Sequence, residues 1–352
     1  MSELTRHSPS DARRRRRRAI VALPIGALIF LALGWSTFWL LARNKADAAL
    51  TDWIAREESA GRRWSCGDRQ IGGYPLVIDI RCELLAFSGD LAGAPTFARM
   101  RRVSIVAPLT APRRINVEAT GPLEVERNHG RLELDWSQLK IYVRGLPERV
   151  ERMTLASEAV RFAFGDDARA WRGTIARVHS HFRREAGAPG AASTIESGFA
   201  GLESPDLDRL AGDTAPAQVA SVISTSQFDK LTRGALAERL ELWRQAGGRL
   251  HLGLIAIQKG EAAIQADGGL GLDQSHRLDG KIDVRLRQAG RIALNAGVNA
   301  GVLREGAMTT QLLAAFLQRA GANGETRLDL SFANGALGVG PLKNIFVLPP
   351  LY

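Results

Sequence analysis

The chain alternates apolar and polar residues in short runs, separated by Gly, Pro or Asn, over most of its length. Side chains of a β-strand point alternately to its two faces, so a period of two predicts strands with one buried face. Residues 131–143 give a clear example, because Leu132, Leu134 and Trp136 share one face. Candidate strands recur about every 10 to 15 residues, a spacing typical of meandering antiparallel sheets rather than βαβ units.

The predicted strands cover most of the chain beyond residue 75. They lie at residues 76–80, 83–88, 100–107, 115–120, 123–127, 131–135, 138–143, 153–164, 175–182, 194–202, 249–258, 261–272, 278–286, 291–296, 326–332 and 336–339. Lys259-Gly260, Asp267-Gly268-Gly269 and Asn334-Gly335 are turn signals between them.

Three stretches instead repeat apolar residues with the period of an α-helix. Residues 46–61 carry one such stripe and end at Gly61. Residues 226–247 carry another behind a capping-box variant at Ser226 and Asp229, and residues 306–320 carry the third. The predicted fold class is therefore α+β and β-rich, with long meandering antiparallel sheets and a few covering helices.

An uncharged apolar segment at residues 19–41 precedes these elements. At about 1.5 Å per residue it is long enough to cross a hydrocarbon core of ~30 Å. Trp35 and Trp39 lie near its far end, as interfacial anchors of membrane helices do. We expect a transmembrane anchor at residues 19–42, ahead of the β-rich body.

The charges around this segment predict its orientation. Arg6 and Arg13–Arg18 precede the segment, whereas only Arg43 and Lys45 closely follow it. By the positive-inside rule, residues 1–18 are a basic cytoplasmic tail, with its first 12 residues disordered. The anchor is then a single span of the inner membrane, and the body is periplasmic.

Much of the formal charge of +10 lies in the tail at residues 1–18, which argues against nucleic-acid binding by the body.

A cleaved signal peptide is the alternative to an anchor. Ala46-Asp47-Ala48 has the small-x-small form of a cleavage site, but the apolar run exceeds the usual h-region of about 7–15 residues. A twin-arginine export signal is weaker still, because the pattern expected around the arginine pair is missing. Either route places the body outside the cytoplasm.

Within that body, the polar, proline-containing residues 204–217 predict a soft boundary between two β-rich lobes, 43–203 and 204–352, the second with two helices.

Cys66 and Cys82 are the two cysteines of the chain, an even number in a compartment that favours disulfides. A Gly72-Gly73-Tyr74-Pro75 turn lies between them, and a strand on each side of it could bring the two cysteines opposite one another. A redox pair is usually closer in sequence, and a metal site would need nearby histidines. We expect a structural disulfide and a structural turn that lock the first hairpin to the membrane-proximal helix.

Residues at both ends of the chain carry a family resemblance. Trp64-x-Cys66, Gly73-Tyr74-Pro75-Leu76 and Arg81-Cys82 resemble the start of the bacterial family called domain of unknown function 2125, and the run 335–342 resembles its ending. The family implies an N-terminal membrane segment and a periplasmic body, and it has no established activity. The strand-rich, membrane-anchored layout is also similar in outline to AsmA-like envelope proteins, whose strands form long curved sheets.

The sequence offers little catalytic or ligand-binding chemistry. His179-x-His181 could supply two metal ligands, but no carboxylate or Cys cluster stands near in sequence, so solvent-facing strand positions are preferred. Gly268-Gly269-x-Gly271 opens no helix, and Asp166-Asp167 is expected to be an exposed turn rather than a calcium site. No cofactor, no metal site and no catalytic residue is predicted. Exposed arginine pairs such as Arg113-Arg114 form a solvated face or hold anionic headgroups.

Three hypotheses about function follow. The first is a non-enzymatic binding module whose concave apolar face holds lipid or another hydrophobic envelope component, since apolar strands outnumber covering helices. The second is a structural or assembly factor that binds an envelope protein through sheet edges or the C-terminal VLPPLY. The third is a hydrolase with catalytic residues scattered along the chain. An open concave face favours the first, and a filled one favours the second.

Overall fold

The structure is a computed structural model of the 352-residue chain. It describes residues 9–91, 94–127, 130–146, 149–165, 170–185, 190–232, 234–288 and 325–352, with side chains described from residue 22 onward. Predicted features at 166–167, 291–296 and 306–320 lie outside the described residues.

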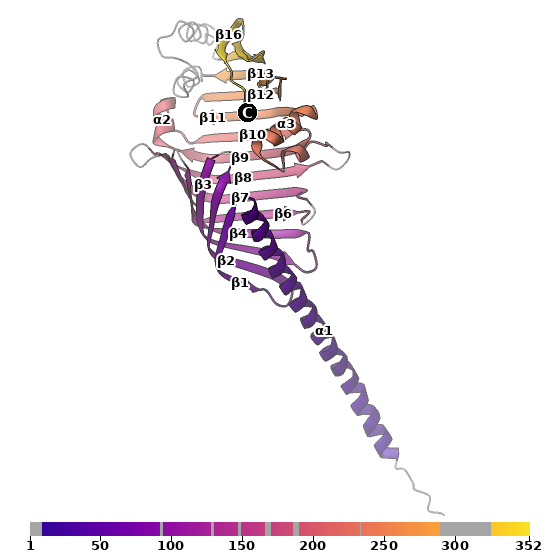
Figure 1. Cartoon of the computed structure of the whole chain (residues 1–352). Helices are drawn as coiled ribbons and strands as arrows, with labels where there is room; N and C mark the ends of the chain where they lie inside the picture. Colours follow the sequence, from indigo (N-terminus) through magenta and orange to yellow (C-terminus); the bar gives the residue numbers. More distant parts are fainter. Residues whose placement is uncertain are drawn as a thin grey trace, which may run out of the picture.

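One continuous helix, α1 (Pro9–Ser59), combines the predicted anchor with the predicted stripe at 46–61. Its segment Ala22–Ser59 is long and apolar enough to cross a membrane. The helix begins earlier than expected, because residues 9–12, which we predicted to be disordered, are helical. Figure 1 shows α1 projecting from the body, with its C-terminal part lying across the first strands.

The body is a single antiparallel sheet. Its strands are β1 (Arg63–Gly72), β2 (Val77–Leu91), β3 (Ala94–Pro108), β4 (Arg114–Arg127), β5 (Gly130–Asp135), β6 (Gln138–Arg144), β7 (Arg152–Gly165), β8 (Trp171–Arg184), β9 (Ser193–Glu203), β10 (Ala217–Thr225), β11 (Leu250–Lys259), β12 (Ala262–Leu272), β13 (Leu278–Arg287), β14 (Glu325–Ala333), β15 (Ala336–Val339) and β16 (Leu342–Val347). Neighbours in sequence pair with one another, except that β5 and β6 both lie between β4 and β7. The predicted β-rich, meandering antiparallel class is confirmed.

Glycines interrupt the strands less than their sequence suggested. The predicted strands 115–120 and 123–127 are one strand, β4, with a register shift near the cis Gly121-Pro122 bond. Asp267-Gly268-Gly269 is not a turn, because all three residues pair with β13 inside β12. Gly268 has a φ of +156°, and a Cβ there would collide with the Lys281 carbonyl oxygen, so this glycine permits close strand approach. Asn334 and Gly335 do form the expected hairpin turn, with φ values of 52° and 75°.

The helical elements differ from the sequence prediction after residue 203. The stretch 226–247 is not one helix but a short 3-10 helix, η1 (Phe228–Leu231), followed by α3 (Leu236–Gln245). Gly234 lies between them with a φ of +95°, and helix α3 starts after Ala235 rather than at a Ser226 cap. The sequence also gave no sign of α2 (Pro205–Ala211), β10 or β16.

The sheet runs without a break across residues 203–204, because β9 pairs with β10 along its length. The division into two lobes stays a prediction. The sheet is strongly curved, and α3 and the end of α1 lie on its concave side (Figure 1). Since the sheet is a single layer, few side chains of the described residues are fully buried. A compact cluster of Leu286, Leu328 and Val339 forms near the C-terminal end.

Candidate functional site

The strand register gives the sheet one apolar face, which we call the apolar face. Residues directly opposite one another in an antiparallel pair share a face, so the pairs Val103–Ala119, Ile141–Leu155 and Val219–Ile257 belong to it. The face continues from β1 to β15 without a change of side. Its larger members include Trp64, Phe87, Leu123, Leu134, Phe162, Phe164, Trp171, Ile175, Phe199, Ile195, Ile223, Ile255, Ile264, Val284 and Leu328.

Among the described residues, α1 and η1 contact aromatic side chains of the apolar face. Near β1, the ring of Trp53 on α1 lies 5.5 Å from Trp64, which lies 4.8 Å from Phe87. Near β8, the η1 residue Phe228 lies 5.3 Å from Phe182. Because these contacts involve the helices on the concave side, the apolar face is the concave one (Figure 1).

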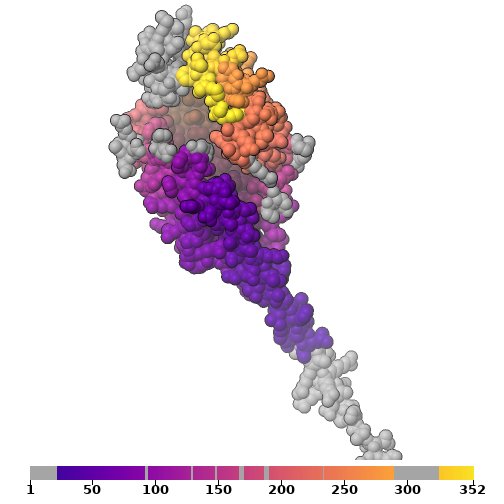
Figure 2. All heavy atoms as spheres, viewed as in Figure 1, coloured from indigo at the N-terminus to yellow at the C-terminus, as the bar shows by residue number. Residues whose placement is uncertain are grey.

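Away from these contacts, much of the apolar face is open in the part of the chain that the structure describes. Figure 2 shows a hollow between the indigo N-terminal part and the orange region of α3, with more distant atoms of the sheet at its back. Large side chains of the face remain accessible on the middle strands: Phe164 on β7 is 57% exposed, Trp171 on β8 49%, Ile195 on β9 40% and Ile257 on β11 37%. Exposed apolar surface is a candidate for binding another apolar group.

A cavity of about 510 Å³ opens on the apolar face beside the end of α1. Its walls come from Trp64, Leu85, Phe87, Met100 and Val125, together with neighbours on the same strands. Almost all of its accessible lining is apolar. A volume of this size lies within the usual range of ligand pockets, roughly 300–1,000 Å³, and the lining can hold a hydrocarbon group.

The opposite face of the sheet is polar and charged. Glu124 there accepts hydrogen bonds from Arg99 and Arg131 on the neighbouring strands β3 and β5. The hydrogen bond from Arg99, followed by the positive charge of both arginines, holds the pKa of Glu124 below its ordinary value, although partial burial opposes this. Ion pairs of this kind suit a solvated face, because each contributes only a few tenths of a kcal/mol to about 1 kcal/mol.

Four arginines, which we call the arginine row, lie directly opposite one another across neighbouring strands of the polar face. Arg114 on β4 faces Arg144 on β6, which faces Arg152 on β7, which faces Arg183 on β8. All four are exposed, and none has an ion pair among the residues that the structure describes. Like charges directly opposite one another destabilise a sheet. The repulsion between these arginines therefore weakens the pairing of β4, β6, β7 and β8.

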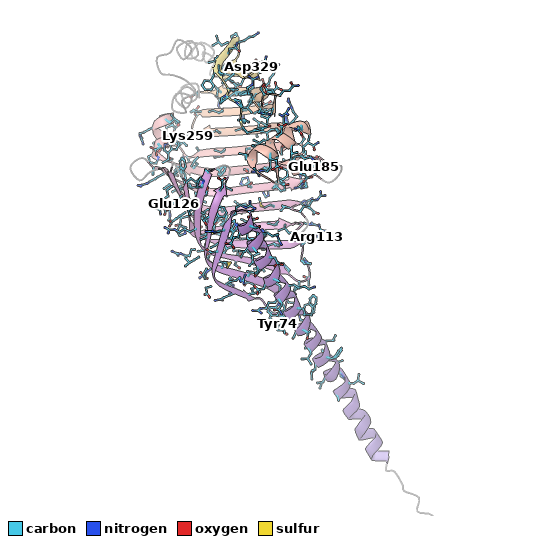
Figure 3. The ribbon with its side chains drawn as sticks, viewed as in Figure 1. Tyr74, Arg113, Glu126, Glu185, Lys259 and Asp329 are labelled. Atoms are coloured by element: carbon cyan, nitrogen blue, oxygen red, sulfur yellow. A yellow bond between two sulfur atoms is a disulfide. The ribbon has the colours of Figure 1, made fainter. Side chains whose placement is uncertain are left out.

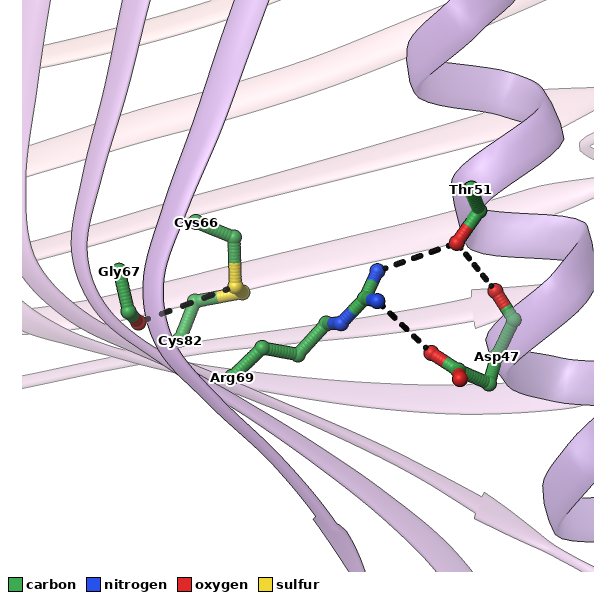
Figure 4. Close-up of a disulfide and its surroundings, with 6 residues drawn as sticks. All are labelled: Asp47, Thr51, Cys66, Gly67, Arg69 and Cys82. Carbon is green, nitrogen blue, oxygen red and sulfur yellow. Dashed lines mark hydrogen bonds and ion pairs between the residues drawn. A yellow bond between two sulfur atoms is a disulfide. The ribbon is translucent and has the colours of Figure 1, made fainter.

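Cys66 and Cys82 form a disulfide with a Cα–Cα distance of 5.1 Å. It joins β1 to β2, close to where α1 packs on the hairpin. Figure 4 shows Arg69 of β1 next to this disulfide, reaching Asp47 at 3.1 Å and the Thr51 hydroxyl at 3.3 Å on α1. The disulfide joins the two strands of the first hairpin, and the ion pair joins this hairpin to α1.

The Gly72-Gly73-Tyr74-Pro75 turn contacts α1 directly. Trp35 donates its indole N–H to the Pro75 carbonyl at 2.8 Å, and Trp39 donates to the Val77 carbonyl at 2.9 Å. The hydroxyl groups of Ser36 and Tyr74 lie 2.9 Å apart. The turn therefore lies against the end of the apolar segment rather than against the sheet.

The candidate histidines do not build a metal site. His179 and His181 share the polar face of β8 with their rings 6.0 Å apart, and His181 contacts the Thr154 hydroxyl at 3.1 Å. Over the described parts of the chain, no group of three His, Cys, Asp or Glu side chains could hold a metal ion. Gly268-Gly269-x-Gly271 lies in the middle of a strand and forms no phosphate-binding loop.

The C-terminal residues bind within this chain. Tyr352 donates its phenol O–H to Glu241 of α3 at 2.7 Å and stacks on His276, while the Leu351 N–H donates to the His276 carbonyl. Hydrogen bonds from Arg244, Tyr352 and Gln245 hold the pKa of Glu241 far below its usual range. Burial and the bond to Glu241 raise the pKa of Tyr352. These contacts tie the end of the chain to α3 on the concave side.

The apolar face and the arginine row could be predicted only in part from the sequence. Alternation within each strand was visible, but only the register shows that every strand presents its apolar positions to the same side. The exposed Phe164, Trp171, Ile195 and Ile257 were not singled out as site residues, and the arginine row could not be seen without strand pairing.

Comparisons with known proteins give one family match. A family model described as an uncharacterized protein conserved in bacteria (DUF2125) matches residues 39–344. No curated protein and no solved structure matches the chain.

Proposed function

This chain belongs to the bacterial DUF2125 family, and we propose that it is a membrane-anchored, non-enzymatic binding module for lipid or another hydrophobic component of the cell envelope. In this proposal α1 crosses the inner membrane with its N-terminus in the cytoplasm, as the arginines before the apolar segment predict. The sheet then lies in the periplasm with its apolar face available to ligand.

The observation that carries the proposal is the open middle of the apolar face. A soluble single-layer sheet usually covers one face with helices or a second sheet, because exposed apolar area is unfavourable. Among the described residues, α1 covers the first strands, η1 covers a region near β8, and α2 contacts β8 and binds Lys259 of β11 through Asp208. In the uncovered middle of the sheet, the side chains of Phe164, Trp171, Ile195 and Ile257 stay 37–57% exposed, a surface that suits acyl chains.

A structural or assembly role is the second candidate. Among the described strands β16 is the last of the sheet, and its outer edge could bind an envelope protein by strand addition. The C-terminal VLPPLY supports this role less than its sequence suggested, because Leu351 and Tyr352 already contact His276 and Glu241. A hydrolase has the least support, since no catalytic arrangement accompanies His179 and His181 in the described structure.

Site-specific photo-crosslinking of the full-length protein in cells tests the proposal. Ile257 and Gln258 are adjacent on β11, both exposed, and point to opposite faces. The same holds for Ile195 and Glu196 on β9. A benzophenone amino acid at Ile257 or Ile195 should form adducts with phospholipid or another apolar molecule, whereas Gln258 and Glu196 should not. Equal lipid labelling at both members of each pair, or protein adducts only, would contradict the proposal.

A further inference from the structure

We infer that the β1–β2 turn, residues 73–76, is immersed in the membrane leaflet from which α1 emerges, and that this leaflet supplies the apolar face with its ligand. The partner of the turn is thus the acyl-chain region of a phospholipid bilayer. The inference rests on the proposed function in that it takes α1 to be the membrane span.

The depth of the turn follows from the helix that it contacts. If the uncharged segment enters the hydrocarbon at Ala19, twenty residues of α-helix, about 30 Å, bring it to the far boundary near Trp39. Trp35 lies one turn, about 6 Å, inside that boundary. Because Trp35 holds the Pro75 carbonyl and Trp39 holds the Val77 carbonyl, the turn between them lies at or within the edge of the hydrocarbon core.

The side chains of the turn suit this position. Tyr74 is 56% exposed and Leu76 is 59% exposed, although both are large and apolar or amphipathic. The Tyr74 ring packs edge-on against Trp39 at 5.5 Å, with its hydroxyl on Ser36. Tyrosine and tryptophan prefer the interfacial region, where an apolar ring and a polar tip are both accommodated.

Four backbone carbonyls in and next to the turn have hydrogen-bond donors within the protein, which favours immersion. An unpaired carbonyl or N–H costs several kcal/mol in hydrocarbon, so irregular backbone there needs protein partners. The Gly73 carbonyl accepts from the Val77 N–H, and the Leu76 carbonyl accepts from the Leu109 N–H. Side chains of α1 satisfy the Pro75 and Val77 carbonyls, and Pro75 has no N–H to satisfy.

Charged residues mark the upper limit of immersion. Arg43 is the first charged residue after the apolar segment, and it donates a 3.1 Å hydrogen bond to the Ile71 carbonyl. Ile71 lies in β1, two residues before the turn begins. The neighbouring β3–β4 turn begins beside Leu76, and it contains Arg113, which is followed by Arg114 at the start of β4. Figure 3 shows Tyr74 close to α1, nearer the projecting helix than Arg113 on the edge of the sheet. The first strands of the apolar face therefore start at the bilayer surface, and a lipid can move onto them without crossing water.

Depth-dependent fluorescence quenching of the full-length protein in vesicles of phosphatidylcholine and phosphatidylglycerol tests the inference. Leu76→Cys carries an NBD label, and Gln274→Cys in the β12–β13 turn is the control, at the same edge but the far end of the sheet. Cys66 and Cys82 stay oxidised and do not react. Doxyl-labelled lipid should quench the label at residue 76 strongly and leave the label at 274 unchanged, while aqueous iodide should do the reverse.

Equal access of iodide to the two labels would overturn the immersion of the turn. A second variant, Leu76→Asp, keeps the test independent of labelling, because it should reduce transfer of a fluorescent phospholipid from vesicle to protein without changing the fold of the body. Failure of the proposed function looks different. In that case the label at residue 76 is quenched by doxyl lipid, but benzophenone at Ile257 captures no lipid.

Discussion

The indole N–H of Trp39 donates a 2.9 Å hydrogen bond to the backbone carbonyl of Val77, and Trp39 itself is only 7% exposed. This bond joins the end of the apolar segment to the second strand of the sheet, 38 residues later in the chain. Helix α1 and the sheet are therefore one packed unit at this point, rather than a tether and a free domain.

Trp39→Phe should loosen that junction. The variant keeps an aromatic ring but leaves the Val77 carbonyl without its donor, a loss of about 1 to 2 kcal/mol in the local opening free energy. Faster amide hydrogen exchange in the peptide that contains Val77 measures it. Phe30→Leu, at a position 77% exposed on the same helix, is the control and should leave the exchange unchanged. Unchanged exchange in Trp39→Phe would show that the bond contributes nothing to the junction.

Loss of the disulfide should lower stability without removing a specific activity. Closure of the loop between Cys66 and Cys82, separated by 16 positions, stabilises the folded chain by about 3 kcal/mol in the chain-entropy model. The double variant Cys66→Ser/Cys82→Ser should therefore unfold at a clearly lower temperature in the same detergent. An identical midpoint for the variant and the oxidised protein would remove the structural role of this pair.

The arginine row should weaken the sheet, and Arg144 has a like charge on both sides. Arg144→Gln removes both repulsions, so we expect stabilisation by about 0.2–1 kcal/mol at low salt, and less at high salt as screening increases. Arg177→Gln is the matched control on the same face, because Arg177 lies opposite Glu158 and loses an attraction instead. Chemical unfolding at two salt concentrations measures both. Destabilisation in Arg144→Gln at low salt would contradict the repulsion.

Glu124 should make the free energy of unfolding depend on pH in the acid range. Arg99, and then Arg131, lower its pKa in the folded chain. The stabilisation is therefore complete above the ordinary value of 4.5 and is lost as the pH falls through the lower, folded value. Between pH 7 and acid conditions the wild type should lose more unfolding free energy than Glu124→Gln. Glu261→Gln, at an exposed position in the turn between β11 and β12, should behave as the wild type does. Identical pH profiles for the wild type and Glu124→Gln would rule out the effect.

Local patterns predicted much of this fold. The uncharged segment, the alternating strands and the Asn334-Gly335 turn each follow from residues within a few positions of one another. The errors have local causes as well. Gly268 looked like a turn residue because glycine also permits close strand approach, and Gly234 interrupts a helical stripe that the apolar pattern alone could not divide.

The candidate site depends on relationships that no local pattern contains. Which side each strand presents is fixed by its register with its neighbours, and register shifts such as that between Met100 and Arg102 on β3 reset the alternation. The alignment of Arg114 with Arg144 joins positions 30 residues apart. The bond from Trp35 to Pro75 joins positions 40 apart, so the depth of the turn could not be read from either segment.

Native mass spectrometry of the full-length protein, extracted in mild detergent, tests the central claim most directly. Wild-type protein should carry co-purified lipid, and Ile195→Asp/Ile257→Asp should lose it, because two carboxylates on the apolar face make acyl chains unfavourable there. Gln218→Asp/Gln258→Asp adds the same charge on the polar face of neighbouring strands and should retain the lipid. Wild-type protein without lipid, or equal loss from both double variants, would contradict binding by the apolar face.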